Sequence, residues 1–152
     1  MLGIVASSGS GAAPPPPPPP NYGPELVVNG IFTTDTASWS SGTGATLSVV
    51  SGQLKILSAG SNATAQQTVS GLTVGNIYRF TAEMAPSQAN RASIALGGAT
   101  SAGLNYATTG SPSLTFTAEF TSLTITLYAA DAAWADAGQH ALFDNVSVRQ
   151  IL

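Results

Sequence analysis

The chain has 152 residues, of which 43% are hydrophobic and only 7% are charged, and its formal net charge is −3. Four basic residues cannot form the basic patch that nucleic-acid binding requires, and the absence of cysteine excludes a disulfide framework, a thiolate metal site and a cysteine nucleophile. No apolar run is long enough to span a bilayer, and so few charges favour neutral partners or packing into a larger assembly.

The N-terminal segment differs in composition from the rest of the chain. Residues 1–13 are small, apolar or serine, and residues 14–20 are consecutive prolines. Because proline lacks an N–H donor and has a fixed φ, this tract predicts an extended polyproline II rod. The apolar stretch Met1–Ala6 lacks the positive charge and the length of a signal peptide. We expect an anchor peptide at 1–13, a spacer at 14–24 and a folded domain at 25–152.

From residue 26 onward, short runs of alternating apolar and polar residues are separated by turn signals, which is typical of β-strands. One hairpin is predicted around the turn Ser51–Gly52. The predicted strands are 26–28, 47–49, 54–56, 63–69, 78–84, 92–96, 114–118, 123–127 and 141–148, with loops at 40–44, 99–112 and 129–139. The pattern predicts an all-β fold, an antiparallel β-sandwich of the jelly-roll type with an extended N-terminal tail.

The alternation also predicts which side chains face the core. Phe80, Phe116 and Phe143 occupy apolar positions of their strands, so we expect them to be buried. One face of the strand at 63–69 is predicted to carry Ala63, Ala65, Gln67 and Val69.

Three segments of the chain resemble the jelly rolls of carbohydrate-binding modules, which are related to galactose-binding domains. These segments are Glu25–Phe32 followed by Trp39, then Gln67–Ala82, and finally Phe143–Val148. The resemblance implies this fold over residues 25–150, with the closing strand beside the first strand and Trp39 packed in the core. It implies less about function, because the same fold carries glycan binders, adhesion modules and structural domains.

Jelly rolls of this kind often hold a structural calcium ion near the junction of the first and last strands. The resemblance implies Asp144 as a ligand, with Asp35 and Glu25 as further candidates. However, the acidic residue expected directly after Phe32 is replaced by Thr33. Calcium prefers about six to eight oxygen ligands, usually with more than one carboxylate. We therefore expect no cofactor, with calcium left open as the one alternative.

The sequence does not predict an enzyme. The sole histidine, His140, precedes Asp144 by four residues, and Ser147 follows. Residues that far apart on one strand are separated by about 13 Å, which is too far for a catalytic triad. No Gly-x-Ser-x-Gly motif is present. No spacing selects a carboxylate pair for glycoside hydrolysis from the candidates Glu83, Glu119, Asp131, Asp136 and Asp144.

Glycan binding is the more plausible chemistry, because sugars stack on aromatic rings while amides and carboxylates bind their hydroxyls. Trp134 lies in a predicted loop with Asp131, Asp136 and Gln139. Tyr106 lies in another predicted loop, beside Asn105. Either ring is a candidate sugar platform, and the alternative is that each ring folds back to cover the core.

The order of a small-residue N-terminus, a proline tract and a β-sandwich is similar to the build of bacteriophage fibre and decoration proteins. This resemblance implies that residues 1–13 dock onto other virion proteins and that the domain is displayed at the virion surface, as an oligomer. The prediction is a non-catalytic binding or decoration module that binds cell-surface glycans, with no nucleic-acid partner and no membrane insertion. The alternatives are a purely structural virion protein without glycan binding, and an extracellular location.

Overall fold

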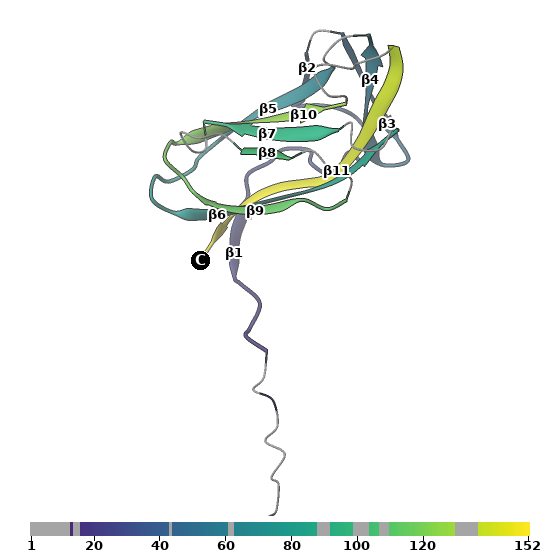
Figure 1. Cartoon of the computed structure of the whole chain (residues 1–152). Helices are drawn as coiled ribbons and strands as arrows, with labels where there is room; N and C mark the ends of the chain where they lie inside the picture. Colours follow the sequence, from purple (N-terminus) through teal and green to yellow (C-terminus); the bar gives the residue numbers. More distant parts are fainter. Residues whose placement is uncertain are drawn as a thin grey trace, which may run out of the picture.

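The computed structural model describes residue 13 and residues 16–42, 44–60, 63–87, 92–98, 104–106, 110–129 and 137–152, with only the backbone for 104–106. These residues form eleven β-strands in two antiparallel sheets. Figure 1 shows the sheets as two layers, with residues 16–21 leading away from both. The described part of the chain contains no helix with the length and apolarity that a membrane crossing requires.

The larger sheet, sheet A, is organised around the long C-terminal strand β11. Its order is β3 (Ala45–Val50), β4 (Gln53–Ala59), β11 (Ala137–Ile151), β6 (Ile77–Pro86) and β9 (Ser113–Thr117). Strand β1 (Tyr22–Glu25) also pairs with β11. Because β6 pairs with β11 over residues 141–150, β4 and β1 share the opposite edge: β4 takes the first part and β1 the last.

The second sheet, sheet B, has five strands, all between residues 40 and 128. Its order is β2 (Ser40–Ser41), β5 (Thr64–Ser70), β10 (Ser122–Tyr128), β7 (Ser93–Gly97) and β8 (Leu104–Tyr106). Sheet B faces sheet A in Figure 1, and the core lies between them. The predicted antiparallel β-sandwich is confirmed.

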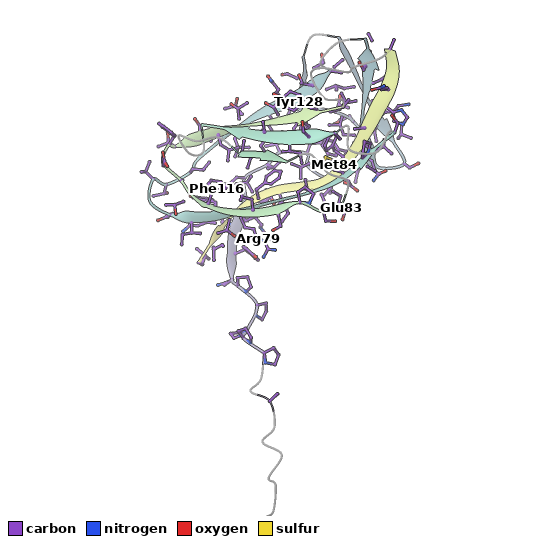
Figure 2. All side chains as sticks on the ribbon, viewed as in Figure 1. Arg79, Glu83, Met84, Phe116 and Tyr128 are labelled. Carbon is purple, nitrogen blue, oxygen red and sulfur yellow. The ribbon has the colours of Figure 1, made fainter. Side chains whose placement is uncertain are left out.

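The buried side chains are those that the alternation predicted. Phe80, Phe116 and Phe143 are buried, as are the four residues expected on one face of the strand at 63–69, although Ala63 directly precedes β5. Figure 2 shows Phe116 between the layers. The predicted hairpin is also confirmed, since β3 and β4 are joined by Ser51 and Gly52, with φ of 52° and 77°. Two left-handed residues in a two-residue turn match the twist of the flanking strands.

The predicted first strand at 26–28 is wrong, because the first strand is β1, which begins at Tyr22 within the expected spacer. A side chain explains why the backbone of Val28 needs no strand partner. The Gln67 amide accepts from Val28 N at 2.9 Å and donates to Val28 O at 2.8 Å. Pro24 fits in β1 because the strand pairs along one edge only, where a missing N–H is tolerated.

Three loop predictions are also corrected. The segments 40–44 and 99–112 contain the short strands β2 and β8, and β11 begins at Ala137 rather than at residue 141. Their sequences are rich in Gly and Ala, which have low intrinsic strand preference, so pairing with a neighbouring strand decides their conformation.

The opening motif closes one end of the core through a close backbone contact. Gly30 O accepts from Val146 N of β11 at 2.9 Å, and a Cβ atom on Gly30 would overlap the Val146 carbonyl oxygen. Trp39 is buried, donates from Nε1 to Asn29 O at 3.1 Å and packs on Phe32 with ring centroids 5.6 Å apart. The core position implied for Trp39 is confirmed.

We expect Gly30→Ala to lower the free energy of unfolding by about 3 kcal/mol, because the added methyl group forces the opening motif away from β11. Gly97→Ala is the matched control, since a Cβ there meets its nearest atom only at 4.0 Å. Chemical denaturation measures both variants. Equal stability of the two would contradict the close contact at Gly30.

Candidate functional site

The charged side chains of the described strands lie on the outer face of sheet A. Each occupies a solvent-facing position of its strand: Lys55, for example, lies between the buried residues Leu54 and Ile56. The group consists of Glu25, Lys55, Arg79, Glu83, Asp144 and Arg149. In contrast, none of the strands of sheet B carries a charged residue. Figure 2 shows Arg79 and Glu83 on the lower layer and Tyr128 on the upper layer.

The outer face of sheet B, here called the uncharged face, presents hydroxyl and amide groups. Its residues on β5, β10 and β7 are Thr64, Gln66, Thr68, Ser70, Ser122, Thr124, Thr126, Tyr128, Ser93, Ala95 and Gly97. Thr126 lies at its centre between Gln66 and Ala95 and is only 7% exposed, whereas Gln66 is exposed. Neighbouring groups therefore cover the centre of the face, and among the described side chains its one aromatic ring, Tyr128, is half-buried.

The glycan-binding residues predicted from the sequence fall into three groups. Trp134, Asp131 and Asp136 lie outside the described residues. The backbone of Tyr106 and Asn105 is in β8 at the edge of sheet B, rather than in a loop.

Gln139 is likewise in a strand rather than in the predicted loop. It belongs to β11, and its side chain is 7% exposed because it faces inward, as Ala141 does.

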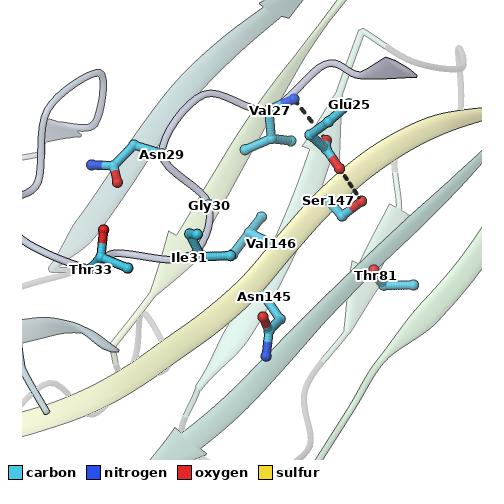
Figure 3. A pocket seen from close by; sticks show the side chains of 10 residues that line it. All are labelled: Glu25, Val27, Asn29, Gly30, Ile31, Thr33, Thr81, Asn145, Val146 and Ser147. Atoms are coloured by element: carbon cyan, nitrogen blue, oxygen red, sulfur yellow. Dashed lines mark hydrogen bonds between the residues drawn. The ribbon is translucent and has the colours of Figure 1, made fainter. Parts of the chain in front are cut away.

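A hollow of about 580 Å³ lies where β1, β6 and β11 meet on the outer face of sheet A (Figure 3). Its lining includes Glu25, Thr81, Asn145 and Ser147. Glu25 Oε1 accepts from the backbone N–H groups of Leu26, Val27 and Val148 at 3.0, 2.9 and 2.9 Å. Its Oε2 accepts from Ser147 Oγ at 2.5 Å. This carboxylate therefore fastens the end of β1 to β11.

The carboxylates considered for calcium do not fit such a site. Protein donors engage both oxygens of Glu25, and Asp35 Oδ1 accepts from Asn29 Nδ2 and Ala37 N, each at 3.0 Å. Asp144 Oδ1 accepts from its neighbouring N–H at 2.8 Å. Among the described residues, no three His, Cys, Asp or Glu side chains come together in a group that could hold a metal ion.

His140, Asp144 and Ser147 are not arranged as a triad. The Ser147 hydroxyl donates to Glu25, and Asp144 accepts a backbone N–H. Within the described part of the chain, no hydrogen bond joins the three side chains. The Ser147 hydroxyl therefore has no histidine beside it to act as a general base.

No protein-family model matches the sequence, and no curated protein matches it. Solved structures do match. A CBM4 carbohydrate-binding module aligns with a TM-score of 0.60 and 16% identity, over 81% of this chain and 98% of the module. The N-terminal cellulose-binding domain of Cellulomonas fimi β-1,4-glucanase C aligns with a TM-score of 0.58 and 14% identity, over 82% and 96%. The fold is that of a carbohydrate-binding-module jelly roll.

A segment of a phage protein also aligns with this chain. The enzymatically active domain of tailspike protein 4 from bacteriophage CBA120 aligns with a TM-score of 0.63 and 14% identity, over 84% of this chain and 21% of the tailspike chain. At these identities the likeness establishes the fold.

We expect Glu25→Ala to lower the free energy of unfolding by about 1 to 3 kcal/mol, because the Val27 and Val148 N–H groups lose their acceptor at the β1–β11 junction. Glu83→Ala, which removes an exposed carboxylate from the same face, serves as the control and should be nearly neutral. Thermal unfolding of the unmodified chain should be the same with millimolar calcium and with a chelator. A calcium-dependent rise in its melting temperature would show that a metal site exists.

Proposed function

We propose that the chain is a non-catalytic module that binds a neutral polysaccharide on the uncharged face of sheet B. The separation of charge between the two sheets is the observation that carries this proposal. Burying a charged group against a neutral ligand costs free energy, whereas hydroxyl and amide groups exchange water for sugar hydroxyls at little net cost. A face with such groups and no charge is suited to a chain of neutral sugars.

Tyr128 supplies an aromatic surface for this face. It ends β10, flanked by Thr64 of β5 and Ser93 of β7, and its ring is half-buried. A ring fixed in this way can stack on the C–H face of a sugar with little loss of side-chain entropy.

The two platforms predicted from the sequence are related to Tyr128 in different ways, Tyr106 by strand register and Trp134 by chain order. The backbone of Tyr106 pairs with Ile94, next to the residue that pairs with Tyr128. Trp134 lies in the connection that follows β10 in the sequence. Ile94 is buried, so this register places Tyr106 on the inner side of sheet B and Asn105, the partner of Ala95, on the uncharged face. Register and chain order thus support Tyr128, Asn105 and Trp134 as parts of one glycan-binding region.

We expect Tyr128→Ala and Trp134→Ala each to weaken polysaccharide binding about tenfold, or about 1.4 kcal/mol, through loss of ring stacking. Isothermal titration with β-1,4-linked glucan, xylan and galactan oligosaccharides gives the affinities, since a solved module of this fold is a cellulose-binding domain. Phe120→Ala removes an exposed aromatic ring outside the uncharged face and should leave binding unchanged.

Two outcomes would contradict the proposal. Binding that survives both substitutions would remove the aromatic platform. The absence of binding to any neutral glycan would leave the structural role as the better explanation.

That structural role is favoured by one specific observation. Val74, Ile77 and Phe120 are exposed apolar side chains. The two loops around them are joined by hydrogen bonds from Gly75 N to Ala118 O and from Ala118 N to Asn76 O, at 2.8 and 2.9 Å. Exposed apolar groups on adjoining loops are suited to packing against another protein.

We further propose that the module is mounted on a virion through residues 1–13. Three observations support this location: the small-residue N-terminus, the proline tract, and the segment of a phage tailspike that aligns with this chain. Residues 16–21 are exposed and lie outside any strand, as a spacer requires.

Deletion of residues 2–13 should abolish incorporation into purified virions while leaving the melting temperature of the domain unchanged. Immunoblotting of gradient-purified particles provides the measurement. A chain in which residues 2–13 are replaced by a Gly/Ser segment of equal length controls for spacing. If either altered chain is incorporated normally, residues 1–13 are not the anchor.

A further inference from the structure

Arg79 and Arg149 are directly opposite each other on the outer face of sheet A. They are register partners on the adjacent strands β6 and β11. Like charges placed directly across a pair of strands repel each other and destabilise the pairing. The nearest acid, Glu25, has Oε2 4.0 Å from Arg149 Nε, but its carboxylate already accepts four shorter hydrogen bonds. The positive charge of this arginine pair is therefore only partly balanced.

Neighbouring groups hold both guanidinium groups in place. Arg79 donates from Nε to Ser113 Oγ at 3.0 Å and from Nη1 to Tyr22 Oη at 2.9 Å. Arg149 donates from Nε to Gly23 O at 3.1 Å. Both side chains are thereby hydrogen-bonded to β1, the strand that follows the proline spacer.

A hollow of about 230 Å³ lies between the two arginines, lined by Tyr22, Arg79, Thr81, Ser147 and Arg149. Within the described residues, no hydrogen bond occupies Arg79 Nη2 or either Nη atom of Arg149. The Tyr22 hydroxyl accepts from Arg79, which leaves its own proton available as a donor. The hollow thus brings together two guanidinium groups and a phenol, all with free N–H or O–H donors.

We propose that this hollow is a binding site for a tetrahedral oxyanion, a phosphate group. Guanidinium groups form paired, charge-assisted hydrogen bonds with such oxyanions, and an anion between the arginines would remove their repulsion. A planar carboxylate has two oxygens and fills one guanidinium fork. A tetrahedral anion directs oxygens to both forks and to the Tyr22 hydroxyl at once.

The site goes beyond the proposed glycan function, because it lies on sheet A and the uncharged face lies on sheet B. It is not a result of general basicity, since the chain has a net charge of −3. The oxyanion has two chemical sources, a free phosphate ion or a phosphodiester within a polymer. Inorganic phosphate and dimethyl phosphate are the probes that distinguish them.

The test is isothermal titration of the full chain with inorganic phosphate, dimethyl phosphate and acetate, at constant ionic strength set with chloride. We expect saturable binding of at least one phosphate probe and weaker binding of acetate. Arg149→Gln should weaken phosphate binding at least tenfold, and Tyr22→Phe, which keeps both arginines, severalfold. Binding of inorganic phosphate identifies the free ion as a ligand, and binding of dimethyl phosphate alone identifies a diester.

Lys55→Gln is the matched control, because it removes one positive charge from the same face outside the hollow. It should bind phosphate as the unmodified chain does. The proposal is overturned if neither phosphate probe binds, if acetate binds as tightly as phosphate, or if Lys55→Gln loses as much affinity as Arg149→Gln. Circular dichroism establishes that each variant is folded, and Tyr22→Phe provides the decisive variant if the arginine substitution unfolds the domain.

Discussion

The pairing of β11 along both edges is the constraint on which the rest of the structure depends. One edge is occupied by β6, while the other is divided between β4 and β1. The division falls near Asn145, which has a φ of 50°, and the register with β6 shifts between Asp144 and Ser147. A bulge of this kind bends a strand and increases its twist. A single strand can therefore hold both the β3–β4 hairpin and the segment that leads to the proline spacer.

This arrangement also determines where the charged groups gather. Beyond the bulge, Ser147 and Arg149 face outward beside Thr81 and Arg79 of β6, and the Glu25 carboxylate closes over them from β1. The carboxylate satisfies donors that the short β1 strand leaves without a partner, so it stabilises the junction as a hydrogen-bond acceptor more than as one half of an ion pair. The opposite sheet needs no charge for its stability, and its outer face is free to present neutral groups.

Much of the sandwich could be predicted because alternation directly encodes which side chains face the core, as in β6 and β10. The first strand could not, because the sequence from Tyr22 to Glu25 contains proline and glycine and is held by partners more than 120 residues away. Val28 was misassigned because a strand and a segment held by the Gln67 side chain look alike in sequence. Gln139 was misplaced because an inward-facing amide resembles a loop residue. The sequence shows that each charged residue lies at a solvent-facing position of its strand. It does not show that all these strands belong to one sheet, because strand order depends on pairing between distant segments.

Both proposed sites bear on the stability of the junction between the spacer and the domain. A module held by its N-terminus and bound to a polysaccharide through sheet B transmits tension through β1, the shortest strand of sheet A. Four strand residues supply little backbone pairing, so side chains must hold this junction. Glu25 of β1 accepts a hydrogen bond from β11, and Arg79 of β6 and Arg149 of β11 each donate one to β1. An oxyanion between the arginines would add to the same connection, because Tyr22 belongs to β1, Arg149 to the adjacent strand β11 and Arg79 to β6 on the far side of β11. If both proposals hold, an anion in the hollow would also strengthen β1, the strand through which tension from the N-terminus would pass.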